Sequence, residues 1–186
     1  MPIAEIRKDA EARMTKSVEA LRHELQRLRT GRASTALVEH LKVSYYGSDV
    51  PLSQVANVAV SDARSITITP WEKQMVGPVE KAILASDLGL TPTTAGVVIR
   101  INIPALTEER RRDLTKHVHH EGEAAKVAVR NVRRDAMQQI QALLKDRKVT
   151  EDEERRAEDD IQKLTDRYVK NVDDVVKLKE QELMAV

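Results

Sequence analysis

Apolar residues recur at every third or fourth position along the first 29 residues of the chain, with charged residues between them. This spacing places the apolar side chains on one face of a helix, which predicts a long amphipathic α-helix over residues 1–29. The apolar positions are Ile3, Ile6, Ala10, Met14, Val18, Leu21, Leu25 and Leu28. Thr30-Gly31 follows, and we expect the helix to end there because glycine tolerates a positive φ.

The pattern changes to alternation between residues 41 and 103. Hydrophobic and polar residues alternate through 41–45, 58–60, 66–68 and 97–103, with turn-forming residues between them, which predicts strands joined by hairpins. A short amphipathic helix is expected from Pro78 to Leu88, closed by Gly89, because proline suits a first helical turn. The stretch from Thr91 to Gly96 is expected to form a loop.

The helical period returns after Leu106 and continues to the end of the chain. The first apolar stripe is Leu114, Val118, Ala125, Val129, Val132, Ala136, Ile140 and Leu143, and the second is Ile161, Leu164, Tyr168, Val172, Val175 and Leu183. Between the stripes, Thr150 and Glu153 have the spacing of a capping box. We therefore predict two long helices joined by a tight connection.

A lone amphipathic helix cannot bury its stripe, so residues 1–29 are expected to pack on the C-terminal helical hairpin. The predicted fold is α+β. An elongated three-helix bundle, residues 1–30 plus 106–186, carries an inserted small β/α/β domain, residues 31–105, on a two-strand hinge at Thr30, Gly31, Pro104 and Ala105. Trp71 is expected to be a partly buried anchor of the small domain. Because the bundle can bury its stripes internally, we expect a monomer.

Composition narrows the classes of protein that fit. The chain has 186 residues, 31 Lys and Arg against 30 Asp and Glu, no cysteine and 2% aromatic residues. The absence of cysteine excludes disulfides and thiolate metal sites. No apolar run approaches the ~20 residues needed to span a bilayer and no signal peptide is evident, so we expect a cytoplasmic protein without a membrane partner. The near-neutral charge leaves room only for a local basic stripe.

Motifs typical of enzymes are missing. The sequence contains no P-loop, no GxGxxG and no GxSxG. His117 and Glu121 fall one helical turn apart and could contribute to a zinc site, but no obvious third and fourth ligands accompany them. We therefore predict no catalytic residue, no metal and no cofactor; a metal enzyme built on the histidines is a competing hypothesis that elemental analysis would test.

Basic residues gather on one outward face of the predicted helix after residue 106. They are Arg112, Lys116, Lys126, Arg130, Arg133 and Arg134. Like charges at this spacing destabilise a helix by roughly 0.2–0.5 kcal/mol per pair, so the face needs either an anionic partner or acidic cover. Arginine favours the first alternative because its planar fork suits phosphate. The second alternative is a solvated face neutralised by residues such as Asp135 and Glu123.

Gly122 lies inside the same predicted helix, where glycine costs about 1 kcal/mol relative to alanine. Three explanations remain open at this stage. The glycine could give local flexibility beside His119-His120, allow the close approach of another segment, or simply be tolerated in a long helix.

Several motifs occur in the order found in one known family. They are Ile6-Arg7-Lys8-Asp9-Ala10-Glu11, Leu28-Arg29-Thr30-Gly31-Arg32-Ala33-Ser34, Tyr45-Tyr46-Gly47, Val79-Glu80-Lys81-Ala82-Ile83, Ser86-Asp87-Leu88-Gly89-Leu90, Leu106-Thr107-Glu108-Glu109-Arg110-Arg111, Val127-Ala128-Val129-Arg130-Asn131-Val132-Arg133-Arg134-Asp135-Ala136 and Asp159-Asp160-Ile161-Gln162-Lys163-Leu164-Thr165. Together they cover essentially the whole chain, which closely resembles the bacterial ribosome recycling factor family.

This resemblance implies an L-shaped molecule that hydrolyses nothing itself. With elongation factor G and GTP, such proteins split the post-termination 70S ribosome and release mRNA and deacylated tRNA. Their bundle lies on the 23S rRNA of the large subunit. Carried over residue by residue, the implied rRNA-binding residues are Arg29, Arg32, Arg110, Arg130, Arg133 and Arg134.

A helical adaptor is the alternative from another functional class. Such a protein would use its bundle to bind a protein partner and would have no RNA role. It predicts an apolar docking groove and weak dependence of binding on salt, whereas the sequence predicts a charged face.

Overall fold

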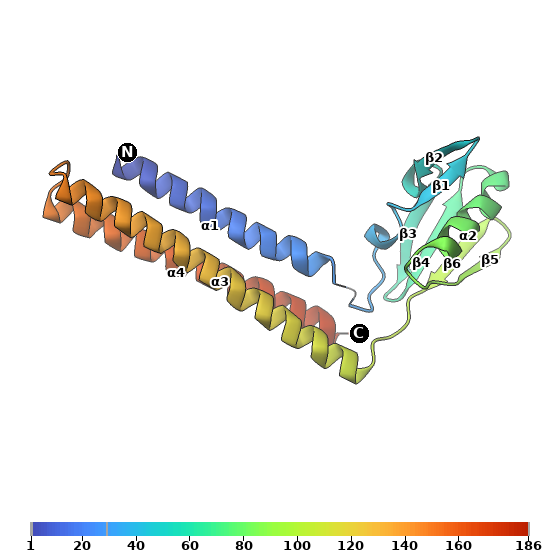
Figure 1. The fold of residues 1–186 in the computed structure, drawn as a ribbon. Helices are drawn as coiled ribbons and strands as arrows, with labels where there is room; N and C mark the ends of the chain where they lie inside the picture. Colours follow the sequence, from blue (N-terminus) through green and yellow to red (C-terminus); the bar gives the residue numbers. More distant parts are fainter. Residues whose placement is uncertain (1, 29, 186) are drawn as a thin grey trace. The chain divides into compact units, whose positions relative to one another are not determined.

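The computed structural model describes residues 2–28 and 30–185, and the chain divides into two compact units (Figure 1). The helical unit combines Met1–Arg29 with Glu108–Ala185, and the small unit is Thr30–Thr107. One unit is thus inserted into the sequence of the other. The predicted fold class, α+β with a helical bundle and a small inserted β-containing domain, is confirmed.

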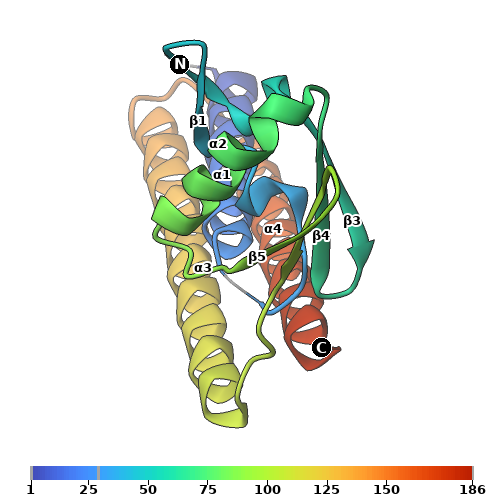
Figure 2. The ribbon, with the colours of Figure 1, turned by 90° about the vertical axis from the view of Figure 1, so that its right-hand side faces the viewer.

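Three long helices form the helical unit. They are α1 (Ile3–Gln26), α3 (Glu108–Lys145) and α4 (Glu151–Met184), and they lie side by side with α3 antiparallel to the other two (Figures 1 and 2). The predicted stripes are buried between them, with exceptions at their ends. Ile3 and Leu28 of the first stripe are only partly covered, and in α4 the buried valine is Val176, while Val175 is only partly covered. Among the described residues, no helix is both long and apolar enough to cross a membrane.

Helix α1 ends earlier than the hydrophobic pattern predicts. Its last residue is Gln26 rather than residue 29, because the N–H groups of Arg27 and Leu28 bond to carbonyls three residues back, which tightens the chain out of the α-helical path. Gly31 has a φ of 76°, so the expected positive φ is confirmed at that residue.

The connection between α3 and α4 follows the prediction closely. Thr150 Oγ1 accepts a hydrogen bond from the Glu153 N–H at 3.2 Å, and Glu153 Oε2 accepts one from the Thr150 N–H at 2.7 Å. This reciprocal pair confirms the capping box and fixes the residue at which α4 begins.

The small unit contains two antiparallel sheets and one α-helix. In the first sheet, β1 (Lys42–Tyr45) pairs with β2 (Ser48–Pro51). The second has the order β3-β4-β6-β5, formed by β3 (Ala56–Asp62), β4 (Ser65–Pro70), β6 (Val98–Asn102) and β5 (Pro92–Ala95). Helix α2 is Val76–Ala85, and short 3₁₀ helices occupy Thr35–Leu37, Leu52–Gln54 and Lys73–Met75.

Strand β5 corrects the expectation of a loop over Thr91–Gly96. It is an edge strand that starts at Pro92, where a missing N–H does no harm, and its side chains are mostly exposed. An edge strand of polar residues shows no hydrophobic alternation, which is the signal on which the sequence prediction depends. Helix α2 also ends three residues before the predicted Leu88.

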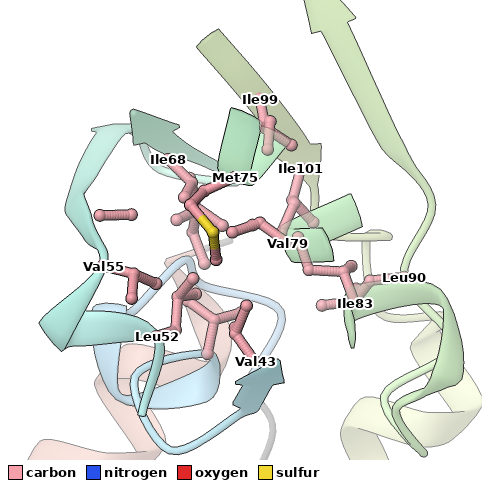
Figure 3. Packing of buried hydrophobic residues seen from close by; sticks show 13 residues of the cluster. Val43, Leu52, Val55, Ile68, Met75, Val79, Ile83, Leu90, Ile99 and Ile101 are labelled. Carbon is pink, nitrogen blue, oxygen red and sulfur yellow. The ribbon is translucent and has the colours of Figure 1, made fainter. Parts of the chain in front are cut away.

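Aliphatic side chains and one methionine fill the core of the small unit (Figure 3). Ile68 and Ile101 from the sheet, Val79 and Ile83 from α2, and Leu52 are each 1% exposed or less. Trp71 contributes nothing to this core: it is 67% exposed, so the expectation of a partly buried anchor was wrong. The tryptophan follows β4 directly, beyond the last core position of that strand.

Both segments that connect the small unit to the helical unit are bonded to a single turn. The Ala33 N–H donates to the Ala63 carbonyl at 2.8 Å, and the Ile103 N–H donates to the Arg64 carbonyl at 2.7 Å. Ala63 and Arg64 form the turn between β3 and β4. The two connecting segments therefore enter the small unit next to each other.

Candidate functional site

Four basic side chains form an exposed row on one side of α3. Arg112 and Arg130 are separated by eighteen residues, about five turns of an α-helix, so they lie on the same side. Lys116 and Arg134 follow each of them by roughly one turn. All four are exposed, and we call this set the basic face.

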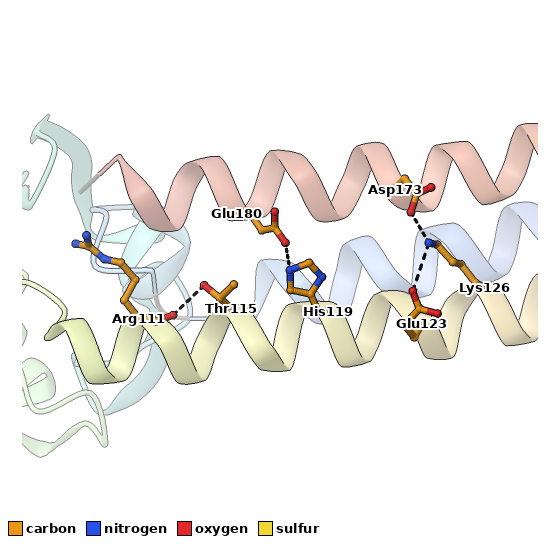
Figure 4. A network of polar contacts seen from close by, with 7 residues as sticks. All are labelled: Arg111, Thr115, His119, Glu123, Lys126, Asp173 and Glu180. Atoms are coloured by element: carbon orange, nitrogen blue, oxygen red, sulfur yellow. Dashed lines mark hydrogen bonds and ion pairs between the residues drawn. The ribbon is translucent and has the colours of Figure 1, made fainter.

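Lys126 was predicted in the same stripe, but ion pairs within the helical unit occupy it (Figure 4). Its Nζ atom lies 2.5 Å from Asp173 Oδ1 on α4 and 3.4 Å from Glu123 Oε1 on α3. The hydrogen bond to Asp173 is the main cause of the raised pKa of Lys126, which keeps the ammonium charged. Its side chain is only 18% exposed. Lys126 therefore stabilises the contact between α3 and α4.

Arg133 lies one turn from Arg130, at the edge of the basic face on the side of α3 that contacts α4. It is half-buried, and its Nη1 donates to Gln162 Oε1 at 2.9 Å. The Gln162 Nε2 in turn donates to Asp166 Oδ1 at 2.9 Å. Arg133 is thus held in place by a neutral amide.

Acidic cover from Asp135 and Glu123 was the alternative for the whole stripe. Asp135 instead receives a hydrogen bond from Arg13 of α1 at 2.8 Å, and Glu123 pairs with Lys126. Within the part of the chain that the structure describes, Arg130 and Arg134 form no ion pair. These two arginines keep their charge available to an external anion.

The other predicted rRNA-binding residues lie elsewhere. Arg110 precedes Arg130 by twenty residues, about five and a half turns, so it faces the opposite side of α3. Arg32 belongs to the small unit, where its side chain is exposed. Arg29 lies outside the described residues. The helical spacing therefore places Arg130, Arg133 and Arg134 near one another and Arg110 on another side of α3.

The predicted hinge residues occupy the two connecting segments. Thr30 and Gly31 are buried, and Pro104 and Ala105 are exposed. All four lie on the helical-unit side, in sequence, of Ala33 and Ile103, the two residues that are hydrogen-bonded to the β3–β4 turn.

The histidine-rich stretch of α3 contacts α4. The His119 imidazole contacts the Glu180 carboxylate (Figure 4). One turn later, Gly122 is buried directly against Val176. A Cβ atom added at Gly122 would lie 2.5 Å from Val176 Cγ2, so close approach is the correct explanation of this glycine. Over the described residues, no three His, Cys, Asp or Glu side chains gather in a way that could hold a metal.

Sequence reasoning missed the partners that α4 supplies. Gln162 and Asp173 determine the states of Arg133 and Lys126, yet both are separated from them by a helical hairpin. The pattern of one helix shows which residues share a side, whereas the register between two helices depends on how their side chains interlock.

Comparison with known proteins gives this surface its context. A family model described as "Ribosome recycling factor" matches residues 21–184. The chain is also 64% identical over 182 residues to the ribosome-recycling factor of Xanthomonas campestris pv. campestris (strain B100), with 98% of each chain covered. The chain belongs to the ribosome recycling factor family.

Solved structures of this family have the same fold. The solution structure of a ribosome recycling factor superposes with a TM-score of 0.76 at 45% identity, covering 100% of this chain and 99% of that one. A second match, with a TM-score of 0.64 and 45% identity over 98% of this chain and 99% of the other, is the T. thermophilus ribosome recycling factor. That factor comes from models in which it and E. coli elongation factor G are bound to the E. coli post-termination complex.

Membership in the ribosome recycling factor family confirms the resemblance inferred from the motifs and gives the chain a role in ribosome recycling during protein biosynthesis. The family is named for a translation factor and not for a catalysed reaction, in agreement with the prediction that the chain is not an enzyme.

Proposed function

We propose that this chain acts on the post-termination 70S ribosome together with elongation factor G and GTP in the cytoplasm. In this reaction the ribosome is split into its subunits, and mRNA and deacylated tRNA are released. The T. thermophilus relative associated with elongation factor G and the post-termination complex supports this assignment. The chain itself contributes binding and force transmission, and the GTPase supplies the hydrolysis.

The helical unit is the proposed rRNA-binding part, and the basic face carries that proposal. Arg130 and Arg134 are exposed and form no ion pair among the described residues. Phosphates of an RNA backbone can therefore pair with their positive charges. Arg133 adds a third guanidinium at the edge. We assign these three arginines to contacts with 23S rRNA. Arg29, Arg32 and Arg110 are proposed as further contacts outside the basic face.

The two connecting segments are the proposed hinge. The contacts of Ala33 and Ile103 with the β3–β4 turn fasten both segments to the small unit. Rotation is therefore expected in the residues between these contacts and the long helices, which include Thr30, Gly31, Pro104 and Ala105. Movement of the small unit by elongation factor G would then be passed to the bundle through both segments.

Recycling itself is tested by sucrose-gradient analysis of stalled post-termination ribosomes. We expect disassembly into subunits only when this protein, elongation factor G and GTP are all present, with each component omitted in turn as a control. Intact ribosomes in the complete reaction, with the elongation factor shown to be active, would contradict the proposal and favour the helical adaptor.

The rRNA assignment is tested by Arg133→Ala and Arg130→Ala. Each exposed or edge substitution should leave stability within about 0.5–1 kcal/mol, because neither side chain fills the core. Each phosphate contact that is lost should lower the slope of log K against log salt by about 0.7–0.9. Wild-type affinity and slope in both variants would overturn the assignment.

A further inference from the structure

The cations of the helical unit differ in the kind of partner that holds them. Lys126 pairs with Asp173, Arg13 with Asp135 and Arg167 with Glu11, and each of these partners is a carboxylate. Arg133 instead donates to the Oε1 atom of Gln162, and among the described residues it forms no ion pair. Arg133, one turn from Arg130, is therefore the one of these four cations whose partner is a neutral acceptor.

A neutral acceptor has a specific electrostatic effect. The amide oxygen of Gln162 orients the guanidinium through one hydrogen bond but does not cancel its charge. Arginine has five N–H donors, so most of them remain available to a second acceptor. A guanidinium that is fixed and still charged can bind a phosphate through two parallel hydrogen bonds with little loss of side-chain freedom.

The other end of the Gln162 amide binds a carboxylate that could compete for Arg133. Its Nε2 donates to Asp166 Oδ1 at 2.9 Å, one helical turn along α4. Asp166 forms no ion pair with Arg133, although both carboxylate and guanidinium contact the same amide. The glutamine thus stands between the two charges.

We infer that Gln162 is a positioning residue for RNA binding, which orients the Arg133 guanidinium and separates it from Asp166 so that its charge remains free for a phosphate of the rRNA. This inference rests on the proposed function. It goes further because it assigns a role to a neutral residue on α4 that has no charge with which to attract RNA.

The decisive variant is Gln162→Glu, which keeps the length of the side chain and converts the acceptor into an acid. We expect about tenfold weaker binding to isolated large ribosomal subunits at low salt, because one charge-assisted contact with phosphate is lost when Arg133 is neutralised internally. The slope of log K against log salt should fall by about 0.7–0.9, as for one phosphate contact.

Gln181→Glu is the matched control. It adds the same charge at an exposed position of α4, about 28 Å further along the helix, beyond the Debye length of ~10 Å. We expect nearly wild-type affinity and slope. Thermal unfolding of both variants should stay close to wild type, so that a change in the salt slope of Gln162→Glu cannot come from loss of the fold.

A rescue pair tests the separation from Asp166. In Gln162→Leu the amide is lost and Asp166 is free to pair with Arg133, so binding should weaken. Adding Asp166→Asn should recover most of the affinity, because the competing acid is gone. This pair also carries the test if Gln162→Glu does not fold.

The outcomes separate two kinds of failure. If Arg133→Ala weakens binding while Gln162→Glu and Gln162→Leu bind like wild type, the positioning role is wrong and the rRNA assignment stands. If Arg133→Ala also binds like wild type, both the inference and the assignment of Arg133 are wrong. An equal loss of affinity in Gln181→Glu would overturn the inference as well, since net charge alone would then explain the effect.

Discussion

Tyr46 stands at the tip of the β1–β2 hairpin in a backbone conformation that residues other than glycine rarely adopt. Its φ is 47° and that of Gly47 is 83°, the two positive values that a two-residue type I′ turn requires. The Tyr46 hydroxyl donates to Glu72 Oε2 at 2.8 Å, and the Tyr45 hydroxyl donates to Glu72 Oε1 at 3.0 Å. A single carboxylate therefore restrains both tyrosines beside the hairpin.

Glu72 should determine how these tyrosines titrate. Its hydrogen bonds, and to a lesser extent its negative charge, raise the pKa of Tyr45 and Tyr46 above the ordinary value of 10.0. Because the pKa values are raised in the folded state, the protonated tyrosines stabilise the hairpin below pH 10. This stabilisation is lost as the pH rises through the raised pKa values. In a Tyr168→Phe background, the tyrosinate absorbance of Tyr45 and Tyr46 should therefore appear at a higher pH when Glu72 is present than when it is replaced in Glu72→Gln. Equal midpoints in the two proteins would contradict this role of Glu72.

Lys126 and Arg130 show what residue counting can and cannot determine. Their spacing of four correctly places them near the same side of α3. Only the structure shows that Lys126 is covered by Asp173 while Arg130 is exposed without an ion pair among the described residues. The difference arises because Lys126 lies closer to α4, and a single sequence does not state which acids of α4 stand opposite.

At the scale of elements, Gly122 sets how closely α3 approaches α4. Because an added Cβ would overlap Val176 Cγ2, we expect Gly122→Ala to lower the free energy of unfolding by about 1 kcal/mol. Overpacking typically costs about 1–3 kcal/mol, and the better helix propensity of alanine returns about 1 kcal/mol. Denaturant unfolding measures the change.

Val176→Ala provides the corresponding double-mutant cycle. With the Cγ2 atom removed, Gly122→Ala should become neutral or stabilising, so the two changes should be strongly non-additive. Ala124→Gly, at an exposed position of the same helix, reports helix propensity alone and should cost about 1 kcal/mol. Simple additivity between residues 122 and 176 would show that the close approach is not limited by this contact.

The capping box should contribute to the stability of α4 independently. Thr150→Ala removes the acceptor of the Glu153 N–H, and we expect a loss of about 1 kcal/mol in the free energy of unfolding. Thr150→Ser keeps the hydroxyl and should retain most of that stability. If the alanine and serine variants unfold at the same denaturant concentration, the side-chain cap contributes nothing measurable.

The sequence predicted helices and strands correctly where buried residues recur with a regular period. All eight apolar positions assigned to the stripe of α3 are buried, because a helix with two packed neighbours must cover one continuous stripe. The α4 stripe shifts from Val175 to Val176 near its end, where the precise rotation of the helix depends on α1 and α3. Strand β5 was missed because hydrogen bonding to β6, and not burial, makes it a strand.

At the scale of the whole molecule, two chain segments connect the units, and the backbone conformation of Gly31 sets the direction of one of them. Its φ of 76° is unfavourable for any residue with a Cβ atom. We expect Gly31→Ala to slow ribosome recycling by severalfold while affinity for the large subunit stays nearly unchanged, because the proposed hinge and not the basic face is altered. Sucrose gradients and subunit binding measure the two effects separately.

Gly77→Ala is the control for this substitution. A Cβ at Gly77 meets nothing within 4 Å, and its φ lies outside the left-handed region. Recycling by this variant should be like that of the wild type. If Gly31→Ala recycles ribosomes equally well, the connecting segment does not depend on the conformation of its glycine.

The insertion of the small unit also has a consequence for biosynthesis. Helix α1 is made first, but its partners α3 and α4 begin only at Glu108 and Glu151. At about 5–20 residues per second, the ~80 residues between α1 and α3 take roughly 4–16 s to translate. During that interval the small unit has its own core to fold around, whereas the apolar stripe of α1 has no partner. The nascent chain therefore presents the apolar stripe of α1 to chaperones until α3 emerges, and the three-helix bundle is complete only when α4 has followed.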